Sequence, residues 1–389
     1  MATAFPDGFV WGAATAAHQV EGGNWNSDWW AWETHPDTVC AEPSGDACNH
    51  YELYEQDLDL LKGFGFNAYR FSLEWARIQP EANMWSNAAL DHYRKVAEAC
   101  HERGLTPIVT FHHFTNPRWI AHLGAWEEPD NAKRFADYCA KATERLGDLI
   151  GWACTINEPS IISSIGYLAG GFPPGRRDRN LRRAVDDILI DAHRQAREAI
   201  KAGPGDFPVG LCNAMSDYVA VDGGESKRDQ IRHRMQDIYL EAARDDDFIG
   251  VQTYSRDRVG PDGIVATEDG VPVTQMGYEV WPEALENTIR YAWEKTDGTP
   301  VLVTENGIGI ADDEVRVDYI GRALKGVQNC LADGIDVRGY THWSLLDNFE
   351  WALGYRPTFG LIAVDRTTFE RKPKPSATYL GKIAAANAY

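Results

Sequence analysis

The feature that most constrains the fold is the regular alternation of short apolar runs with longer amphipathic segments along the whole chain. Eight apolar runs predict strands, at residues 10–17, 68–75, 107–114, 153–158, 209–215, 248–254, 301–306 and 338–346. Helical patterns lie between and after them, at residues 51–64, 87–103, 131–149, 181–202, 229–244, 282–295, 315–333 and 376–386. Nearly continuous apolar strands that alternate with helices are typical of a parallel sheet buried on both faces.

Eight such units favour a closed barrel over an open, doubly wound sheet. An open sheet of this class is expected to carry a glycine-rich phosphate turn after its first strand. Here Gly22 and Gly23 follow the first strand without the GxGxxG spacing, and no linker or low-complexity stretch interrupts the chain. We therefore expect an α/β fold, a single (β/α)8 TIM barrel that forms one domain over residues 1–389.

Composition and charge exclude several classes of partner. The formal net charge of -20 makes nucleic acid and anionic membrane surfaces unlikely partners, since phosphate binding needs basic patches. No apolar run is long enough to span a membrane, and the N-terminal residues do not resemble a secretory leader, so we expect a cytoplasmic protein. The seven cysteines, an odd number without CxxC spacing, suit reduced structural thiols. We expect no metal and no cofactor, and the sequence leaves the oligomeric state open.

Polar residues gather where the expected strands end, which is the functional face of such a barrel. These ends carry His18–Gln19, Glu74, His112–His113, Asn157–Glu158, Gln252–Tyr254, Glu305–Asn306 and Trp343. Glu158 ends the strand in WACTINEP and Glu305 ends the strand in PVLVTENG. A lone glutamate there could cap a helix or pair with arginine. Two on one barrel face favour glycoside hydrolysis, which needs a pair of carboxyl groups.

Arg70 lies in the middle of its expected strand and has two compatible interpretations. It could favour an ionised Glu305, or it could form a structural ion pair inside the barrel.

Six motifs, in order from one end of the chain to the other, resemble those of glycoside hydrolase family 1. They are FVWGAATAAHQVEG, AYRFSLEWARIQP, VTFHHFTNPRW, TINEP, VTENG and GYTHWSLLDNFEWALGY. The resemblance implies an exo-acting, β-glucosidase-like enzyme with a retaining double displacement, in which Glu158 is the acid/base and Glu305 the nucleophile. The intact WSLLDNFEW stretch resembles that of relatives that act on unphosphorylated glycosides.

The same resemblance implies a set of substrate-binding residues. They are Gln19, His113, Asn157, Tyr254, Trp343, Glu350 and Trp351. Within this set, Asn157 is implied to act at the 2-hydroxyl, Trp343 to stack under the sugar ring, and Tyr254 to orient the nucleophile. His112 and His113 must point to opposite sides of their strand, and the motif match selects His113.

The chain also departs from the family pattern. It is shorter, mainly between Glu158 and Glu305, which suggests an open leaving-group side that accepts bulky or varied groups. Gln252–Thr253 replaces an Asn–Tyr or similar pair and puts the hydrogen bonding near the nucleophile in question. Phe114–Thr115 and Thr358 are further departures, expected to alter packing or rim contacts.

Three rival interpretations remain at this point. A barrel that binds glycans without cleaving them would be expected to lack one carboxylate, and both are present. A mainly transglycosylating enzyme would share the covalent intermediate. A barrel using a Schiff-base lysine or a metal is disfavoured, because no expected strand contains lysine and no His/Asp cluster has ligand spacing. The sequence does not decide between glucose, galactose and fucose.

Overall fold

A closed barrel of parallel strands forms the centre of the molecule. The computed structural model describes residues 3–389, and within them eight parallel strands close into a ring because β5 pairs with β6. In order around the ring they are β5 (Val209–Ala220), β4 (Trp152–Asn157), β3 (Thr106–His112), β2 (Ala68–Ser72), β1 (Val10–Ala14), β9 (Val337–Trp343), β8 (Val301–Asn306) and β6 (Phe248–Gly260). The expected (β/α)8 TIM barrel is confirmed.

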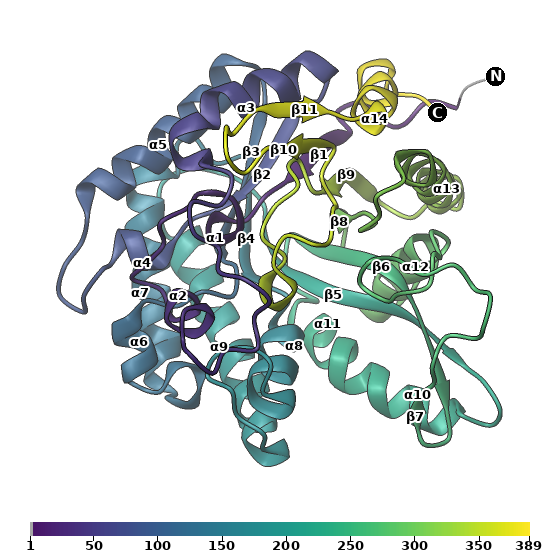
Figure 1. Cartoon of the computed structure of the whole chain (residues 1–389), viewed down its shortest axis with the longest axis horizontal. Helices are drawn as coiled ribbons and strands as arrows, with labels where there is room; N and C mark the ends of the chain where they lie inside the picture. The colour runs from purple at the N-terminus through teal and green to yellow at the C-terminus, as the bar shows by residue number, and fades with distance from the viewer. Residues whose placement is uncertain (1–2) are drawn as a thin grey trace.

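Helices surround the strands (Figure 1). The main ones are α3 (His50–Phe64), α5 (Asn87–Glu102), α7 (Asp130–Leu146), α9 (Arg179–Lys201), α12 (Ala284–Lys295), α13 (Asp313–Ala332) and α14 (Pro375–Ala386). Shorter helices lie in the connections: α1 (Ala17–Val20), α2 (Asp28–Glu33), α4 (Trp75–Ile78), α6 (Arg118–His122), α8 (Pro159–Ile161), α10 (Glu225–Arg232) and α11 (Ile238–Ala242). A small hairpin of β10 (Ile362–Val364) and β11 (Arg371–Pro373) precedes α14.

The barrel interior is packed at one level by side chains from successive strands. This cluster contains Val10, Ala68, Ile108, Cys154, Cys212, Phe248 and Leu302. A larger apolar cluster fills the space between the strands and the surrounding helices. Because side chains fill the barrel, open space for a ligand is left only at the loop-covered ends of its strands.

The last parts of β5 and β6 leave the barrel as a two-stranded ribbon. The sequence predicted that these strands end at residues 215 and 254, which is wrong. Their ladder continues from Asp217 opposite Arg256 to Ala220 opposite Val259, and β7 (Gly263–Ile264) folds back on β6. The extension was missed because it begins with consecutive polar residues, Ser216–Asp217 in β5 and Ser255 to Arg258 in β6, which interrupt the apolar runs. Figure 1 shows the ribbon running out to β7 and α10.

Other differences are smaller. The strands β1, β2 and β9 end at Ala14, Ser72 and Trp343, three residues before their predicted ends, because the chain there turns into the loops that cover the barrel. The predicted helix over 229–244 is broken into α10, a π-helical turn over His233–Asp237 and α11.

The two ends of the described chain lie together, as the backbone N–H of Thr3 donates to the carbonyl of Tyr389 at 2.9 Å. All seven cysteines are free, and six of them are buried, the placement expected of structural thiols. Among residues 3–389 no helix combines the length and the apolar character needed to cross a membrane.

Candidate active site

A cavity of about 650 Å³ opens at the ends of the barrel strands that carry the predicted carboxylates. Its inner part is lined by seven of the sequence-predicted residues and by Gln252; the seven are Gln19, His113, Glu158, Tyr254, Glu305, Trp343 and Glu350. Trp351 borders it as well, while Asn157 and Arg70 lie fully buried behind it. The structure therefore brings all the predicted site residues to one place.

Glu158 is presented by the abrupt end of β4. It follows Asn157 directly, has a left-handed backbone with φ of 45°, and precedes Pro159, the first residue of α8. Proline has no N–H to continue the ladder, so the chain leaves the sheet at this point. The Glu158 side chain is left to line the cavity.

Glu305 is held by the polar groups of neighbouring strands. Arg70 on β2 donates from Nη1 to Glu305 Oε1 at 2.5 Å, and the Tyr254 hydroxyl on β6 donates to the other carboxylate oxygen. Gly307, two residues after Glu305, lies against the backbone of the neighbouring strand β9. A Cβ there would lie 2.0 Å from the Trp343 carbonyl oxygen, so only glycine fits.

The two carboxyl groups have different electrostatic surroundings. Burial raises the pKa of Glu158 well above its usual range, and repulsion from Glu305 acts in the same direction. Burial also raises the pKa of Glu305, but the Arg70 guanidinium and the hydrogen bonds from Tyr254, Arg70 and Gln252 oppose that rise. The surroundings therefore favour the protonated form of Glu158 more strongly than that of Glu305, whose ionised form is stabilised by its neighbours.

A buried chain of hydrogen bonds links these groups to His113. Asn157 Oδ1 accepts from Arg70 Nη2 at 2.7 Å and from Gln252 Nε2 at 2.9 Å. With its oxygen engaged, the Asn157 amide nitrogen faces His113 Nε2 at 3.2 Å. Burial, followed by the Arg70 charge, lowers the pKa of His113 well below its usual value, so the ring is neutral. Gln252, which the sequence analysis put in question, thus takes part in these hydrogen bonds through its donation to Asn157.

The prediction that His112 and His113 face opposite sides of their strand is confirmed. His112 packs edge-on against Trp126 and Phe135 on the outside of the barrel, and its Nε2 lies 3.1 Å from Asn116 Oδ1.

Gln19 and Glu350 bring further polar atoms to the inner cavity. Gln19 Nε2 donates to the Phe349 carbonyl at 2.7 Å and to Asn348 Oδ1 at 3.1 Å, while its Oε1 has no protein partner among the described residues. Burial raises the pKa of Glu350 to about 8; repulsion from Glu305 adds to the rise, and the Trp343 side chain opposes it.

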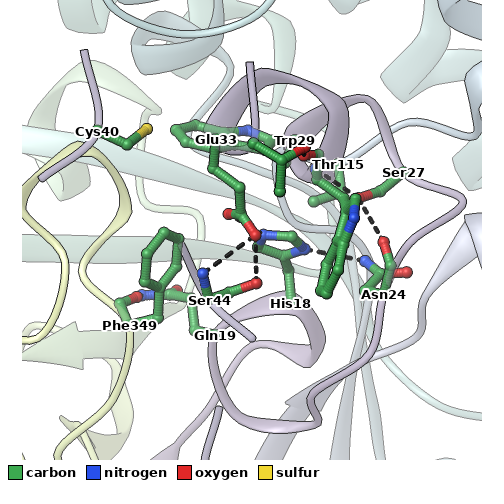
Figure 2. A network of polar contacts seen from close by, with 12 residues as sticks. His18, Gln19, Asn24, Ser27, Trp29, Glu33, Cys40, Ser44, Thr115 and Phe349 are labelled. Atoms are coloured by element: carbon green, nitrogen blue, oxygen red, sulfur yellow. Dashed lines mark hydrogen bonds and ion pairs between the residues drawn. The ribbon is translucent and has the colours of Figure 1, made fainter. Parts of the chain in front are cut away.

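A second polar layer supports this wall from behind. His18 lies between Glu33 and Asn24 (Figure 2): its Nδ1 faces Asn24 Nδ2 at 3.0 Å, and its Nε2 faces Glu33 Oε2 at 3.0 Å. The His18 ring also stacks on Trp351, with centroids 5.6 Å apart and 4° between the planes. Glu33 in turn accepts from the backbone N–H and the hydroxyl of Ser44. Glu33 lies 15 residues after His18 in the chain and holds the His18 ring. Because that ring stacks on Trp351, Glu33 also helps to orient Trp351.

Glu74, one of the strand-end residues, serves this layer instead of the cavity. It caps α4, and its other oxygen accepts from Asn24 and from Thr115, one of the residues that departs from the family pattern. Thr358, another departure, donates to the Ile310 carbonyl at 3.0 Å, a packing contact at the rim.

Sequence reasoning missed the outer part of the cavity. Its walls come from residues after Glu158, from the β5–β6 ribbon and from the loop around residue 276. The only available signal was the placement of methionines, since Met215, Met235 and Met276 all line this part.

Comparison with known proteins agrees with this geometry. The family model described as glycosyl hydrolase family 1 matches residues 1–259 and 252–389. Beta-glucosidase A of Thermotoga maritima is 32% identical over 441 positions, covering 98% of both chains. A bifunctional beta-D-glucosidase/beta-D-fucosidase of Bifidobacterium breve is 31% identical over 455 positions, covering 99% of both chains. A crystal structure of a beta-glycosidase is 49% identical, covers 99% of this chain and 98% of its own, and has a TM-score of 0.94.

The alignment with the Thermotoga enzyme runs over 441 positions, whereas this chain has 389 residues, so it is a shortened relative. From the family match over its whole length and the similarity of its fold, this chain belongs to glycosyl hydrolase family 1 and is a glycoside hydrolase.

Proposed function

We propose that this protein is an exo-acting, retaining β-glycosidase of the β-glucosidase type, which hydrolyses terminal, unphosphorylated β-D-glycosides by double displacement. The observation that carries the proposal is the pair Glu158 and Glu305, which line one cavity in different electrostatic surroundings, because only Glu305 is hydrogen-bonded by Arg70 and Tyr254. Glycoside hydrolysis with retention needs one carboxyl group that holds a proton and another that is ionised.

In the first step, a Glu305 oxygen attacks the anomeric carbon while the bond to the leaving oxygen breaks. Glu158 gives its proton to that oxygen, so the aglycone departs as a neutral alcohol. In the second step, Glu158 takes a proton from water, the water oxygen attacks the anomeric carbon, and Glu305 is released. Arg70 and Tyr254 hold the Glu305 carboxylate in place and favour its ionised form.

The inner cavity suits a sugar because it offers polar atoms that lack protein partners. Gln19 Oε1 and His113 Nδ1 are buried and unpaired within the described part of the chain. Sugar hydroxyls both donate and accept, so they can satisfy both atoms. We assign the stacking platform under the sugar to Trp343 and hydroxyl binding to Gln19, His113, Asn157, Glu350 and Trp351. Because one relative is named for both β-D-glucosidase and β-D-fucosidase activity, we expect the glucoside and the fucoside to be substrates here too.

The free cysteines support our prediction of a reducing, cytoplasmic location.

The test compares p-nitrophenyl β-glucoside, β-galactoside and β-fucoside with the parent protein and two variants. Glu305→Ala should lose activity and regain it with azide, giving the α-glycosyl azide. Glu158→Ala should retain the first step with this activated leaving group and give the β-glycosyl azide. The surface change Glu314→Ala is the control and should behave as the parent.

Release of α-configured sugar by the parent enzyme would overturn the retaining mechanism. A folded protein that binds sugars but releases nitrophenol from none of the β-glycosides would instead favour the non-catalytic glycan-binding barrel. Product analysis at high acceptor concentration measures how much of the intermediate is resolved by a sugar hydroxyl.

A further inference from the structure

Apolar side chains form much of the outer half of the cavity, beside the polar residues Ser216, Ser255, Arg256 and Asp257. Its walls are Ile161, Ile165, Phe172, Met215, Met235 and Met276, which we call the outer wall. Ile161 and Ile165 stand in α8 and in the π-helical turn that follows it (Ile162–Ala169), just after Glu158. The outer wall therefore begins where the proposed proton donor faces the leaving group.

Methionine is concentrated in this wall. The chain has five methionines, and three of them are Met215, Met235 and Met276. Methionine side chains are flexible and polarizable, so they adapt to apolar ligands of different shapes. Such a wall accommodates varied apolar groups and gives few fixed hydrogen bonds.

Apolar residues also stand exposed at the cavity mouth. Val39 and Ile264 are each 59% exposed and Tyr278 is 43% exposed, and all three line this same cavity. Large apolar side chains grouped at the edge of a cleft mark a binding surface. Ile264 belongs to β7, which pairs with β6, so the β5–β6 ribbon contributes this part of the cavity mouth.

Two of the polar groups at this level, Arg256 and Ser255, are already engaged by the protein. Arg256 donates to Glu279 at 2.6 Å and lies over the Trp281 ring at 3.6 Å. The Ser255 hydroxyl donates to the Glu279 carbonyl, also at 2.6 Å. A second sugar in this place would bring hydroxyl groups that need partners, and these groups have little capacity left to supply them.

We propose that the leaving group of this enzyme's preferred substrates is an extended apolar alcohol, bound by the outer wall, and not a second sugar. This inference rests on the proposed function, because it assigns the half of the cavity that faces the aglycone. The sugar is selected by hydrogen bonds in the inner half, and the aglycone is bound by apolar contact in the outer half.

The test is kcat/KM for methyl, butyl, hexyl and octyl β-D-glucosides, below their micelle concentrations, with cellobiose as the sugar-leaving substrate. The alcohols released have similar acidity, so differences report binding of the chain. A fully buried methylene is worth about a fourfold change in binding, so kcat/KM should rise about two- to fourfold per methylene along the series. The octyl glucoside should be a better substrate than cellobiose.

Two variants localise the effect. Ile264→Thr and Ile165→Thr should each lower the octyl-to-methyl ratio of kcat/KM by about two- to fourfold. Val265→Thr is the matched control, since this neighbour of Ile264 faces Gly260, and its ratio should stay at the parent value.

A ratio near one for octyl against methyl glucoside, or a preference for cellobiose, would overturn the inference. If p-nitrophenyl β-glucoside is cleaved while the alkyl series is flat, only the apolar leaving group is wrong. If no β-glycoside is cleaved at all, the proposed function itself fails, so the two outcomes are distinguishable.

Discussion

Removing the Tyr254 hydroxyl tests how the ionisation of Glu305 is controlled. Tyr254 donates to one carboxylate oxygen of Glu305, while Arg70 occupies the other. The Tyr254 ring also packs edge-on against Phe359, with centroids 5.7 Å apart. Tyr254→Phe keeps the ring and its packing and removes only the donor, so its effect reports the hydrogen bond.

The size of the effect follows from the charge on the acceptor. A hydrogen bond to a charged group contributes about 1.5–3 kcal/mol. One pKa unit corresponds to about 1.36 kcal/mol, so loss of this bond should raise the pKa of Glu305 by about 1–2 units. The sign is upward because the hydroxyl stabilises the ionised form. Activity that needs the carboxylate is then lost at a higher pH as the solution is acidified.

The assay is the pH dependence of kcat/KM for p-nitrophenyl β-glucoside in the parent, in Tyr254→Phe and in Tyr278→Phe. In Tyr254→Phe the acid limb should move up by about 1–2 pH units. The basic limb, set by Glu158, should move much less. Tyr278 lies at the outer mouth, so its loss of a hydroxyl should leave both limbs in place. An unmoved acid limb in a folded, active Tyr254→Phe enzyme would refute this account of Glu305.

Three further changes have defined outcomes. Glu305→Gln removes the charge that helps to raise the pKa of Glu158, so that pKa should fall, as followed by ¹³C NMR of labelled glutamate; an unchanged value would contradict the coupling. Asp57→Asn should destabilise the fold by about 3–5 kcal/mol, because it leaves the buried Arg371 without its ion-pair partner. The control is Asp59→Asn, which breaks the exposed pair of Asp59 with Arg103 and should cost about 0–1 kcal/mol. Equal shifts of the two variants in thermal unfolding would refute this. Burial raises the pKa of Asp57, but its hydrogen bonds outweigh that and lower it, so the stabilisation is present above the ordinary aspartate pKa and is lost as pH falls through the lowered value. Gly307→Ala puts a Cβ 2.0 Å from a carbonyl oxygen beside the nucleophile, so kcat should fall sharply; a fully active variant would show that the backbone can move aside.

The sequence could predict the position of the two glutamates because the barrel itself imposes it. Parallel strands in a closed ring have their C-terminal ends on one side, so any residue at such an end faces the same space. The alternation of side chains along a strand separated His113 from His112 for the same reason. Both predictions depend only on periodicity and strand order, which the apolar runs record directly.

The sequence could not predict what depends on contacts between distant loops. Glu74 was predicted at a strand end, as Glu158 was, but it lies two residues beyond the end of β2 and its hydrogen bonds with Asn24 and Thr115 hold it in the supporting layer, away from the cavity. The β5–β6 ribbon was missed because its strands are stabilised by pairing with each other and not by burial in the barrel. The outer wall joins residues more than 100 positions apart, such as Ile161 and Met276, and no local pattern connects them.

The two halves of the cavity imply different degrees of selectivity. In the inner half, an analogue that lacks the hydroxyl bound by Gln19 leaves the buried Gln19 Oε1 without a partner, and a site built on such a hydrogen bond rejects the analogue by about 10⁴–10⁵-fold. In the outer half, each methylene changes binding by only about two- to fourfold, so an apolar wall discriminates weakly among apolar groups of similar size. In the proposed mechanism, Glu158 and Glu305 cleave the bond where the two halves meet, between the sugar and its leaving alcohol. An enzyme built this way is expected to be strict toward the hydroxyls that its buried polar groups bind and permissive toward the aglycone.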